Sequence, residues 1–190
     1  MKVVGDDQAV AGAVERLRRD AVLGFDTETK PCFRKGEFHL PSLIQLASGD
    51  AVCLFQIRAL SFPNPLSDLL SDESVLKVGV GIGRDLAELR EVFPFQPAGF
   101  LGLEEPARDL GFEAAGLRTL AAVLFGFRIS KGAQTSNWER NPLTSKQIRY
   151  AATDAWVGRK IFLRLIDLAG GEMPESWMEG IDGGAPAPAP

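Results

Sequence analysis

Four carboxylates and one tyrosine occupy three separate segments of the chain. Asp26 and Glu28 lie two residues apart in an apolar run, Asp85 follows a second apolar run, and Tyr150 and Asp154 are four residues apart. Carboxylate oxygens are the ligands that Mg²⁺ and other hard divalent cations prefer. Two such cations about 3.5 to 4 Å apart can hold both oxygens of a phosphodiester displacement. The pattern therefore predicts metal-dependent cleavage of nucleic acid.

The elements expected around these residues bring each pair to one face. Residues 21–28 read as a buried strand, in which Asp26 and Glu28 project to the same side. A long helix is expected to begin at a capping-box pattern around Thr144 and to continue to about residue 168, so Tyr150 and Asp154 share a face. Neighbouring carboxylates repel one another unless a cation lies between them. If this helix packs beside the first strand, a site for two cations results.

The remaining elements suggest how the sheet is built. Strands are expected at 42–47 and 51–57, joined by a hairpin turn, and at 75–82. Helices are expected after a candidate cap at Asp7, over 64–70, over 85–93 and over 117–124, whereas 100–110 is ambiguous. Strands followed by alternating strands and helices predict an α/β fold, a mixed β-sheet flanked by helices. We expect one domain over 1–169 and a flexible Gly/Pro/Ala-rich tail over 170–190.

Charge and composition limit the classes of function. The 190 residues suffice for one buried core but not for a nuclease plus a helicase motor. The net charge is −4, yet residues 118–164 contain nine basic and two acidic side chains, which leaves −11 for the rest. Such a positive region can guide a polyanion. With two cysteines, no signal peptide and no membrane span, we expect a soluble cytoplasmic protein without a membrane partner.

Together these segments resemble the DEDDy branch of the 3′-to-5′ exonucleases, which includes RNase D, the proofreading domain of DNA polymerase I and the Werner syndrome exonuclease domain. Three motifs carry the resemblance, in the family's order: Phe25-Asp26-Thr27-Glu28, Gly81-Ile82-Gly83-Arg84-Asp85 and Tyr150-Ala151-Ala152-Thr153-Asp154-Ala155. The Werner-type subgroup looks most similar, through Phe33-Arg34-Lys35-Gly36, Leu43-Ile44-Gln45-Leu46, Ser136-Asn137-Trp138 and Pro142-Leu143-Thr144. The resemblance covers roughly residues 20–168.

The sister branch is excluded because it has histidine five positions before the last aspartate, where this chain has Arg149. His39, the only histidine, is expected to be a loop residue near the site entrance rather than a metal ligand.

The resemblance implies a ribonuclease H-like fold and a two-metal mechanism. It implies that Asp26, Glu28 and Asp154 bind one cation, Mg²⁺ or Mn²⁺, and that Asp26 and Asp85 hold a second through water. Tyr150 would orient the attacking water. The expected reaction is hydrolysis of the terminal phosphodiester of a nucleic acid, with DNA favoured, to release nucleoside 5′-monophosphates.

Substrate contacts are a separate hypothesis. Arg34 and Lys35, between the first two expected strands, are candidates to contact phosphates, and Leu40 is a candidate to press against the last base. Thr27 is placed to approach the sugar. Trp138 has two interpretations, as a residue beside the substrate channel or as a buried structural side chain.

Three alternatives stay open or are rejected at this point. An RNase D-like exoribonuclease in RNA processing is the runner-up, and a nucleic-acid-binding module without activity is a second alternative. A helicase or repair partner acting in trans is compatible with a chain that encodes no motor. A dinucleotide-binding loop at 79–83 is rejected because its spacing is G-x-G-x-G and Asp85 would stand where a pyrophosphate should approach.

Overall fold

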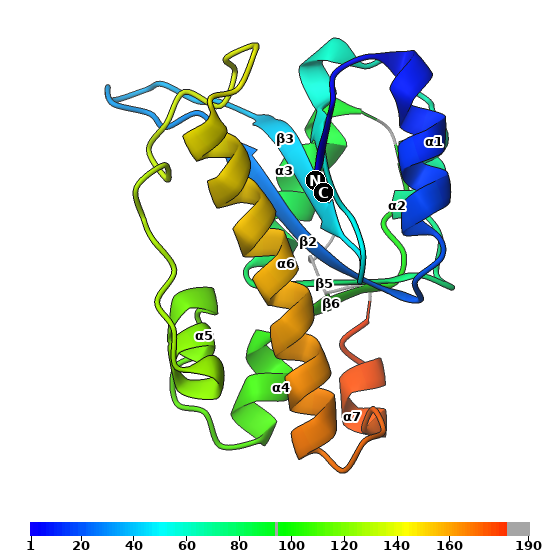
Figure 1. Cartoon of the computed structure of the whole chain (residues 1–190), viewed down its shortest axis with the longest axis vertical. Coiled ribbons are helices and arrows are strands. Elements are labelled where there is room, and N and C mark those ends of the chain that lie inside the picture. The colour runs from blue at the N-terminus through cyan, green and yellow to red at the C-terminus, as the bar shows by residue number, and fades with distance from the viewer. Residues whose placement is uncertain (94, 182–190) are drawn as a thin grey trace, which may run out of the picture.

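Six strands form one mixed β-sheet in the computed structural model, which describes residues 1–93 and 95–181 (Figure 1). The strands are β1 (Lys2–Val4), β2 (Val22–Thr29), β3 (Pro41–Ala47), β4 (Val52–Gln56), β5 (Leu76–Gly79) and β6 (Phe100–Gly102). Their order in the sheet is β1-β4-β3-β2-β5-β6. β2, β3 and β4 pair antiparallel, as expected from the sequence, whereas β1, β5 and β6 pair parallel with their neighbours.

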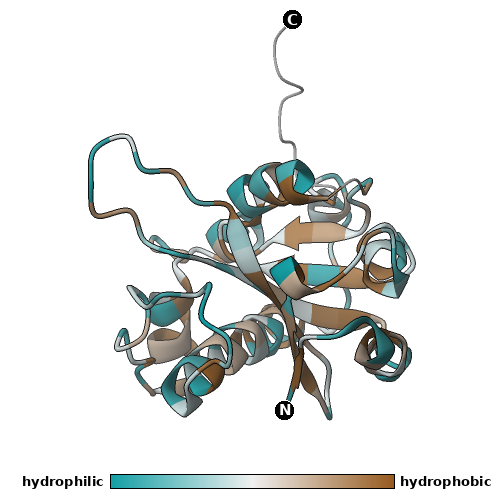
Figure 2. Ribbon diagram, turned by 90° about the horizontal axis from the view of Figure 1, so that it is seen from above, coloured by the Kyte–Doolittle hydropathy of each residue, from teal (hydrophilic) through white to brown (hydrophobic). Residues whose placement is uncertain are grey.

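Helices cover both faces of this sheet. They are α1 (Asp7–Leu17), the 3₁₀ turn η1 (Ile57–Ala59), α2 (Pro65–Leu70), α3 (Ile82–Val92), α4 (Glu104–Asp109), α5 (Leu117–Phe125), α6 (Ser145–Leu168) and α7 (Glu175–Met178). In Figure 1 the long α6 crosses the sheet in front of β2 and β3, with α1 and α2 to one side. Figure 2 shows apolar residues concentrated on the strands and polar residues on the outer sides of the helices.

The alternation of β2 divides its side chains between the two layers. Leu23 and Phe25 enter an apolar cluster with side chains of α1, α2 and α3. Gly24, Asp26 and Glu28 therefore face α6, as the period of two predicts.

Close contact between β2 and α6 depends on a glycine. A Cβ atom at position 24 would lie 1.9 Å from the backbone oxygen of Ala155, so Gly24 admits no side chain. Gly158 differs, since a Cβ atom there would meet its nearest neighbour, the backbone oxygen of Val78, at an ordinary contact distance of 3.7 Å. Gly24 thus lets the helix that carries Asp154 lie directly on the strand that carries Asp26.

The start of α6 follows the expected capping box. The Thr144 hydroxyl accepts from the backbone N–H of Gln147 at 3.3 Å, and the Gln147 side chain accepts from the backbone N–H of Thr144 at 3.0 Å. Both donors would otherwise lack partners at the helix end, so the sequence fixes where α6 begins.

Several elements differ from expectation at their ends. Asp6, rather than Asp7, caps α1 by accepting from the Ala9 N–H at 2.9 Å. Gly81 has a φ of 75°, which ends the β5 segment early and lets α3 begin at residue 82 rather than 85. The ambiguous stretch 100–110 forms β6 and α4, and β1 was not expected.

The stretch 170–181 differs from the flexible tail that we expected. It contains α7, and the Trp177 side chain is 1% exposed and packs in the apolar cluster beneath α6. The indole N–H of Trp177 donates to Asp109 at 3.0 Å. The expectation for residues 182–190 falls outside the described residues. Within residues 1–93 and 95–181, no helix has the length and apolar character needed to cross a membrane.

Candidate active site

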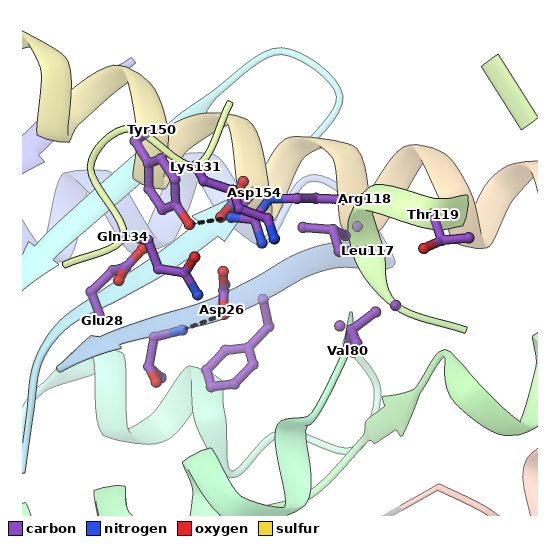
Figure 3. Close-up of a pocket in the computed structure, with 15 residues that line it drawn as sticks. Asp26, Glu28, Val80, Leu117, Arg118, Thr119, Lys131, Gln134, Tyr150 and Asp154 are labelled. Carbon is purple, nitrogen blue, oxygen red and sulfur yellow. Dashed lines mark hydrogen bonds between the residues drawn. The ribbon is translucent and has the colours of Figure 1, made fainter. Parts of the chain in front are cut away.

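A cavity of about 500 Å³ lies between β2 and α6 and is partly open to solvent, and Figure 3 shows the side chains that line it. Segments distant in the chain form its walls: β2, the end of β5, the start of α5, the segment before α6, and α6 itself. Four of the five predicted catalytic or metal-binding side chains meet around it, since Asp26, Glu28, Tyr150 and Asp154 line the cavity.

Three of these carboxylates form a compact group. Each of Asp26, Glu28 and Asp154 offers a carboxylate oxygen that lies within 4.8 Å of the other two. Glu28 and Asp154 are 8% and 6% exposed. Among the described residues, the Oδ1 atom of Asp154 has no hydrogen-bond partner although it is buried. A buried carboxylate oxygen without a donor is costly unless a cation or a proton satisfies it.

The shared electrostatics of this group raise the affinity of each member for protons. Loss of surrounding water, with the charges of Asp85 and Asp154, raises the pKa of Asp26 well above its usual range. Burial and the charge of Asp26 raise the pKa of Glu28 to about 10. Burial also raises the pKa of Asp154 to about 6, against the opposing charge of Arg118. The charged forms are therefore strongly disfavoured in the protein alone.

Asp85 stands apart from this group but influences it. It lies in the first turn of α3, where the Thr27 side chain acts to lower the pKa of its carboxyl. Burial raises the pKa of Asp85 to about 6, and its charge is the largest of the neighbouring charges that raise the pKa of Asp26. Asp85 neither lines the cavity nor belongs to the compact group of Asp26, Glu28 and Asp154.

Tyr150 is held in its un-ionised form at the cavity wall. Its hydroxyl accepts a hydrogen bond from Nη2 of Arg118 at 2.6 Å, and the same hydroxyl lowers the pKa of the nearby Asp154 carboxyl. Burial, together with the negative charges of Asp154 and Glu28, raises the pKa of Tyr150. At neutral pH the group is therefore a phenol with a fixed orientation.

Arg118 is the functional candidate that sequence reasoning missed. It lies in the first turn of α5, and Figure 3 shows it beside Asp154 and Tyr150. It is the cation whose charge lowers the pKa of Asp26, Glu28 and Asp154 together. Lys131 and Gln134 also line the cavity, although neither was singled out. Only their proximity to the motif at 136–138 gave a signal.

A buried amide was also missed. Gln45 pairs directly with Asp26 across β2 and β3 and is 0% exposed. Neither its Nε2 nor its Oε1 has a hydrogen-bond partner in the described part of the chain. Opposite residues in a sheet share a face, so this amide lies beside the carboxylates on the α6 side.

The residues predicted to contact substrate lie partly at the cavity and partly away from it. Thr27 lines the cavity. Arg34 and Lys35 are exposed on the loop between β2 and β3, and neither they nor the partly exposed Leu40 are among the residues lining the cavity. In both Figure 1 and Figure 2 this loop extends away from the body of the domain. Their contact with a longer substrate stays a prediction.

Of the two interpretations of Trp138, the structure shows the buried one. Its side chain is 1% exposed and packs with Ala151 and Ala152 in an apolar cluster. Its ring centroid lies 5.9 Å from that of Tyr150. The prediction that Trp138 contacts substrate is therefore wrong, because its side chain is buried. Trp138 packs against Tyr150 instead.

His39 lies at a carboxylate other than those of the cavity. Its Nδ1 is 3.6 Å from Oε1 of Glu139, which agrees with a loop residue that is not a cavity ligand.

The donor set fits a site for divalent cations. It consists of carboxylate oxygens, the ligand type that Mg²⁺ and Mn²⁺ favour. Without a bound cation, such a site should contain an unsatisfied oxygen and carboxyl groups with raised pKa values. Asp154 Oδ1 is unsatisfied, and the pKa values of Asp26 and Glu28 are raised.

Fold and site together agree with what comparison with known proteins finds. A family model described as 3′-5′ exonuclease matches residues 1–168. The chain belongs to this 3′-5′ exonuclease family.

Among its relatives, the bifunctional 3′-5′ exonuclease/ATP-dependent helicase WRN of Mus musculus is 35% identical over 159 residues, covering 80% of this chain and 11% of that protein. Ribonuclease D of Haemophilus influenzae is 32% identical over 158 residues, covering 82% of this chain and 39% of that protein. The chain thus spans less than half the length of either relative.

A solved structure confirms the fold class. The crystal structure of Escherichia coli RNase D, an exoribonuclease involved in structured RNA processing, matches with a TM-score of 0.81 at 25% identity, covering 94% of this chain and 48% of that one. The sheet and its helices therefore have the ribonuclease H-like arrangement that the sequence resemblance implied.

Proposed function

We propose that this chain is a metal-dependent 3′-5′ exonuclease that shortens a nucleic acid from its 3′ end and releases nucleoside 5′-monophosphates. The observation that carries the proposal is the convergence of Asp26, Glu28 and Asp154 within 4.8 Å in an open cavity beside Tyr150. Membership of the 3′-5′ exonuclease family supports it.

Two divalent cations, Mg²⁺ or Mn²⁺, are part of the proposal. Asp26, Glu28 and Asp154 would hold one, and Asp26 with the more remote Asp85 would hold the other. Such cations, when bound, activate water and neutralise the charge that develops on the phosphate.

The chain's own groups position the reactants. Tyr150 orients the attacking water through its hydroxyl, because its raised pKa makes the phenol a poor base at neutral pH. Arg118 fixes the Tyr150 hydroxyl and presents positive charge to the phosphate. The water oxygen bonds to phosphorus while the bond from phosphorus to the preceding O3′ breaks, which leaves a 3′-hydroxyl on the shortened strand.

We propose DNA as the favoured polymer, supported by the similarity to WRN, with an RNase D-like exoribonuclease as the second candidate, supported by the RNase D relatives. A helicase or repair protein would act with it in trans. An inactive binding module is the less favoured alternative, because every predicted catalytic position keeps its residue. Free thiols at Cys32 and Cys53 support a reducing, cytoplasmic location.

The test is digestion of 5′-labelled DNA and RNA, as single strands and as duplexes with a recessed 3′ end, with Mg²⁺ or Mn²⁺. Wild type should give ladders that shorten from the 3′ end, with a preference between the polymers. Asp154→Ala should abolish turnover, and Tyr150→Phe should reduce it by about 10²-fold because orientation of the water is lost.

Asp167→Ala is the matched control, since Asp167 is an exposed carboxylate near the end of the same helix. It should retain wild-type turnover. Near-normal turnover by Asp154→Ala would contradict the assigned site.

A further inference from the structure

A second cavity, of about 380 Å³, borders Tyr150. Its walls are the segment between α5 and α6 and the first turns of α6. Tyr150 lines both cavities, and the stretch 130–134 contributes to both, with Lys131 and Gln134 in the first cavity and its other three residues in the second. The two cavities are therefore neighbours that share a wall.

The polar part of this second cavity is positively charged. Arg128, Lys146 and Arg149 line it, all three are exposed, and no carboxylate is among its lining residues. Within the described ranges none of the three forms an ion pair. Further along the same helix, by contrast, Arg159 and Arg164 pair with Asp20 and Asp167. The positive charge of the cavity is thus available to an anion.

The apolar part offers a surface for an aromatic base. Phe127 lines the cavity, and its side chain is 39% exposed. Its ring stacks on Phe125 with centroids 5.8 Å apart and planes 12° apart, which fixes its orientation. Ile129 adds to the same wall. Cations beside an exposed aromatic ring are the combination that binds single-stranded nucleic acid without sequence preference.

We propose that this cavity holds one nucleotide of the substrate strand that lies on the 5′ side of the last two nucleotides, which occupy the carboxylate cavity. Its phosphate is bound by Arg128, Lys146 and Arg149, and its base lies on Phe127. The proposal rests on the exonuclease function proposed above, because the shared wall at Tyr150 puts a strand whose 3′ end meets the carboxylates within reach of the second cavity. Backbone contacts there add affinity for long strands and leave the chemistry unchanged.

The test compares a dinucleotide with a single-stranded 12-mer. Arg149→Glu should weaken binding of a labelled 12-mer, measured by fluorescence anisotropy in EDTA, by about tenfold, and should reduce the slope of log affinity against log salt by about one. With divalent metal, kcat/KM for the dinucleotide should stay within about twofold of wild type, because a dinucleotide fills only the carboxylate cavity.

Arg90→Glu is the matched control, with the same change of charge at an exposed position of α3 outside the second cavity. It should change neither measurement. Phe127→Ala should weaken 12-mer binding without altering the salt slope, because stacking involves no counterion release.

The outcomes separate the two proposals. Unchanged 12-mer affinity in Arg149→Glu, or an equal loss on the dinucleotide, overturns the second site. A loss confined to duplexes with a recessed 3′ end assigns the cavity to the complementary strand and also overturns it. Equal losses for DNA and RNA 12-mers are expected, since phosphate is common to both. If wild type cleaves nothing, the exonuclease proposal fails, while the anisotropy comparison still decides whether the cavity binds a strand.

Discussion

Two carboxylate sites in this molecule differ in the charges that surround them. Glu139 lies beside two cations, Arg58 at 2.8 Å and Lys30 at 3.4 Å, and its carboxylate is 3.6 Å from the imidazole of His39. The three carboxylates of the cavity lie close together with Arg118 as the cation whose charge acts on all of them. Glu139 is neutralised by the protein itself and ties the β2–β3 loop to η1. The cavity keeps an excess of negative charge that only protons or cations from solution can balance.

The largest expected difference between the two sites is in catalysis. Glu28→Gln should lower turnover by more than about 100-fold. Removing a residue that only hydrogen-bonds to a metal ligand already costs about 10- to 100-fold in activity, and Glu28 is proposed to be a ligand itself. Glu139→Gln should leave turnover within about fivefold of wild type. Steady-state hydrolysis of one labelled strand by both variants measures this, and equal losses would erase the distinction.

The next difference is in stability, because the two substitutions should shift the Tm in opposite directions. In EDTA at pH 8, Glu28→Gln should raise the Tm by about 3 °C or more, because the raised pKa of Glu28 makes the folded protein hold a proton that the unfolded chain releases at this pH. Glu139→Gln should lower the Tm by about 2 to 4 °C, because partly exposed ion pairs contribute about 1 kcal/mol. Calorimetry of the metal-free proteins tests this. Destabilisation by both substitutions would show that Glu28 is already satisfied within the protein.

The smallest difference between the two sites is in how stability depends on pH. The folded metal-free protein keeps protons on Asp85 and Asp154 up to about pH 6 and on Glu28 up to about pH 10, whereas the unfolded chain releases them near its ordinary values of 3.8 and 4.5. Because the folded pKa values are raised, the stability that these protons confer is complete below about pH 4 and is lost as pH rises through 6 and toward 10.

Mg²⁺ or Mn²⁺ should reverse this trend, since the metal binds the deprotonated carboxylates of the folded state. The gain in Tm on adding metal should therefore be larger at pH 8 than at pH 5. Thermal unfolding across this range, with and without metal, measures it, and an equal gain at both pH values would contradict the cavity as the metal site. Glu139→Gln should show the same pH response as wild type.

The parts of the site that local geometry determines could be predicted from the sequence. Asp26 and Glu28 share a face because a strand has a period of two, and Tyr150 and Asp154 share a face because a helix repeats every 3.6 residues. The cap at Thr144 fixed the start of that helix.

Long-range packing decided what the sequence could not predict. Arg118 reaches Tyr150 only because α5 packs against α6, a contact between residues 32 positions apart. The three-residue β1 exists through its parallel pairing with β4, about fifty residues later. The composition of 170–181 suggested disorder, yet one large side chain, Trp177, buries enough apolar surface to hold that stretch on the domain.

The glycine at position 24 has a consequence for sequence variation in this protein. Any substituent there must push the backbone of Ala155 outward, and Asp154 is the neighbouring residue, so the carboxylates on strand and helix would separate. In a library of random variants, position 24 should therefore tolerate almost nothing, although it touches neither substrate nor cation. A map of tolerated substitutions should show that position 24 is as intolerant of change as the carboxylates of the cavity.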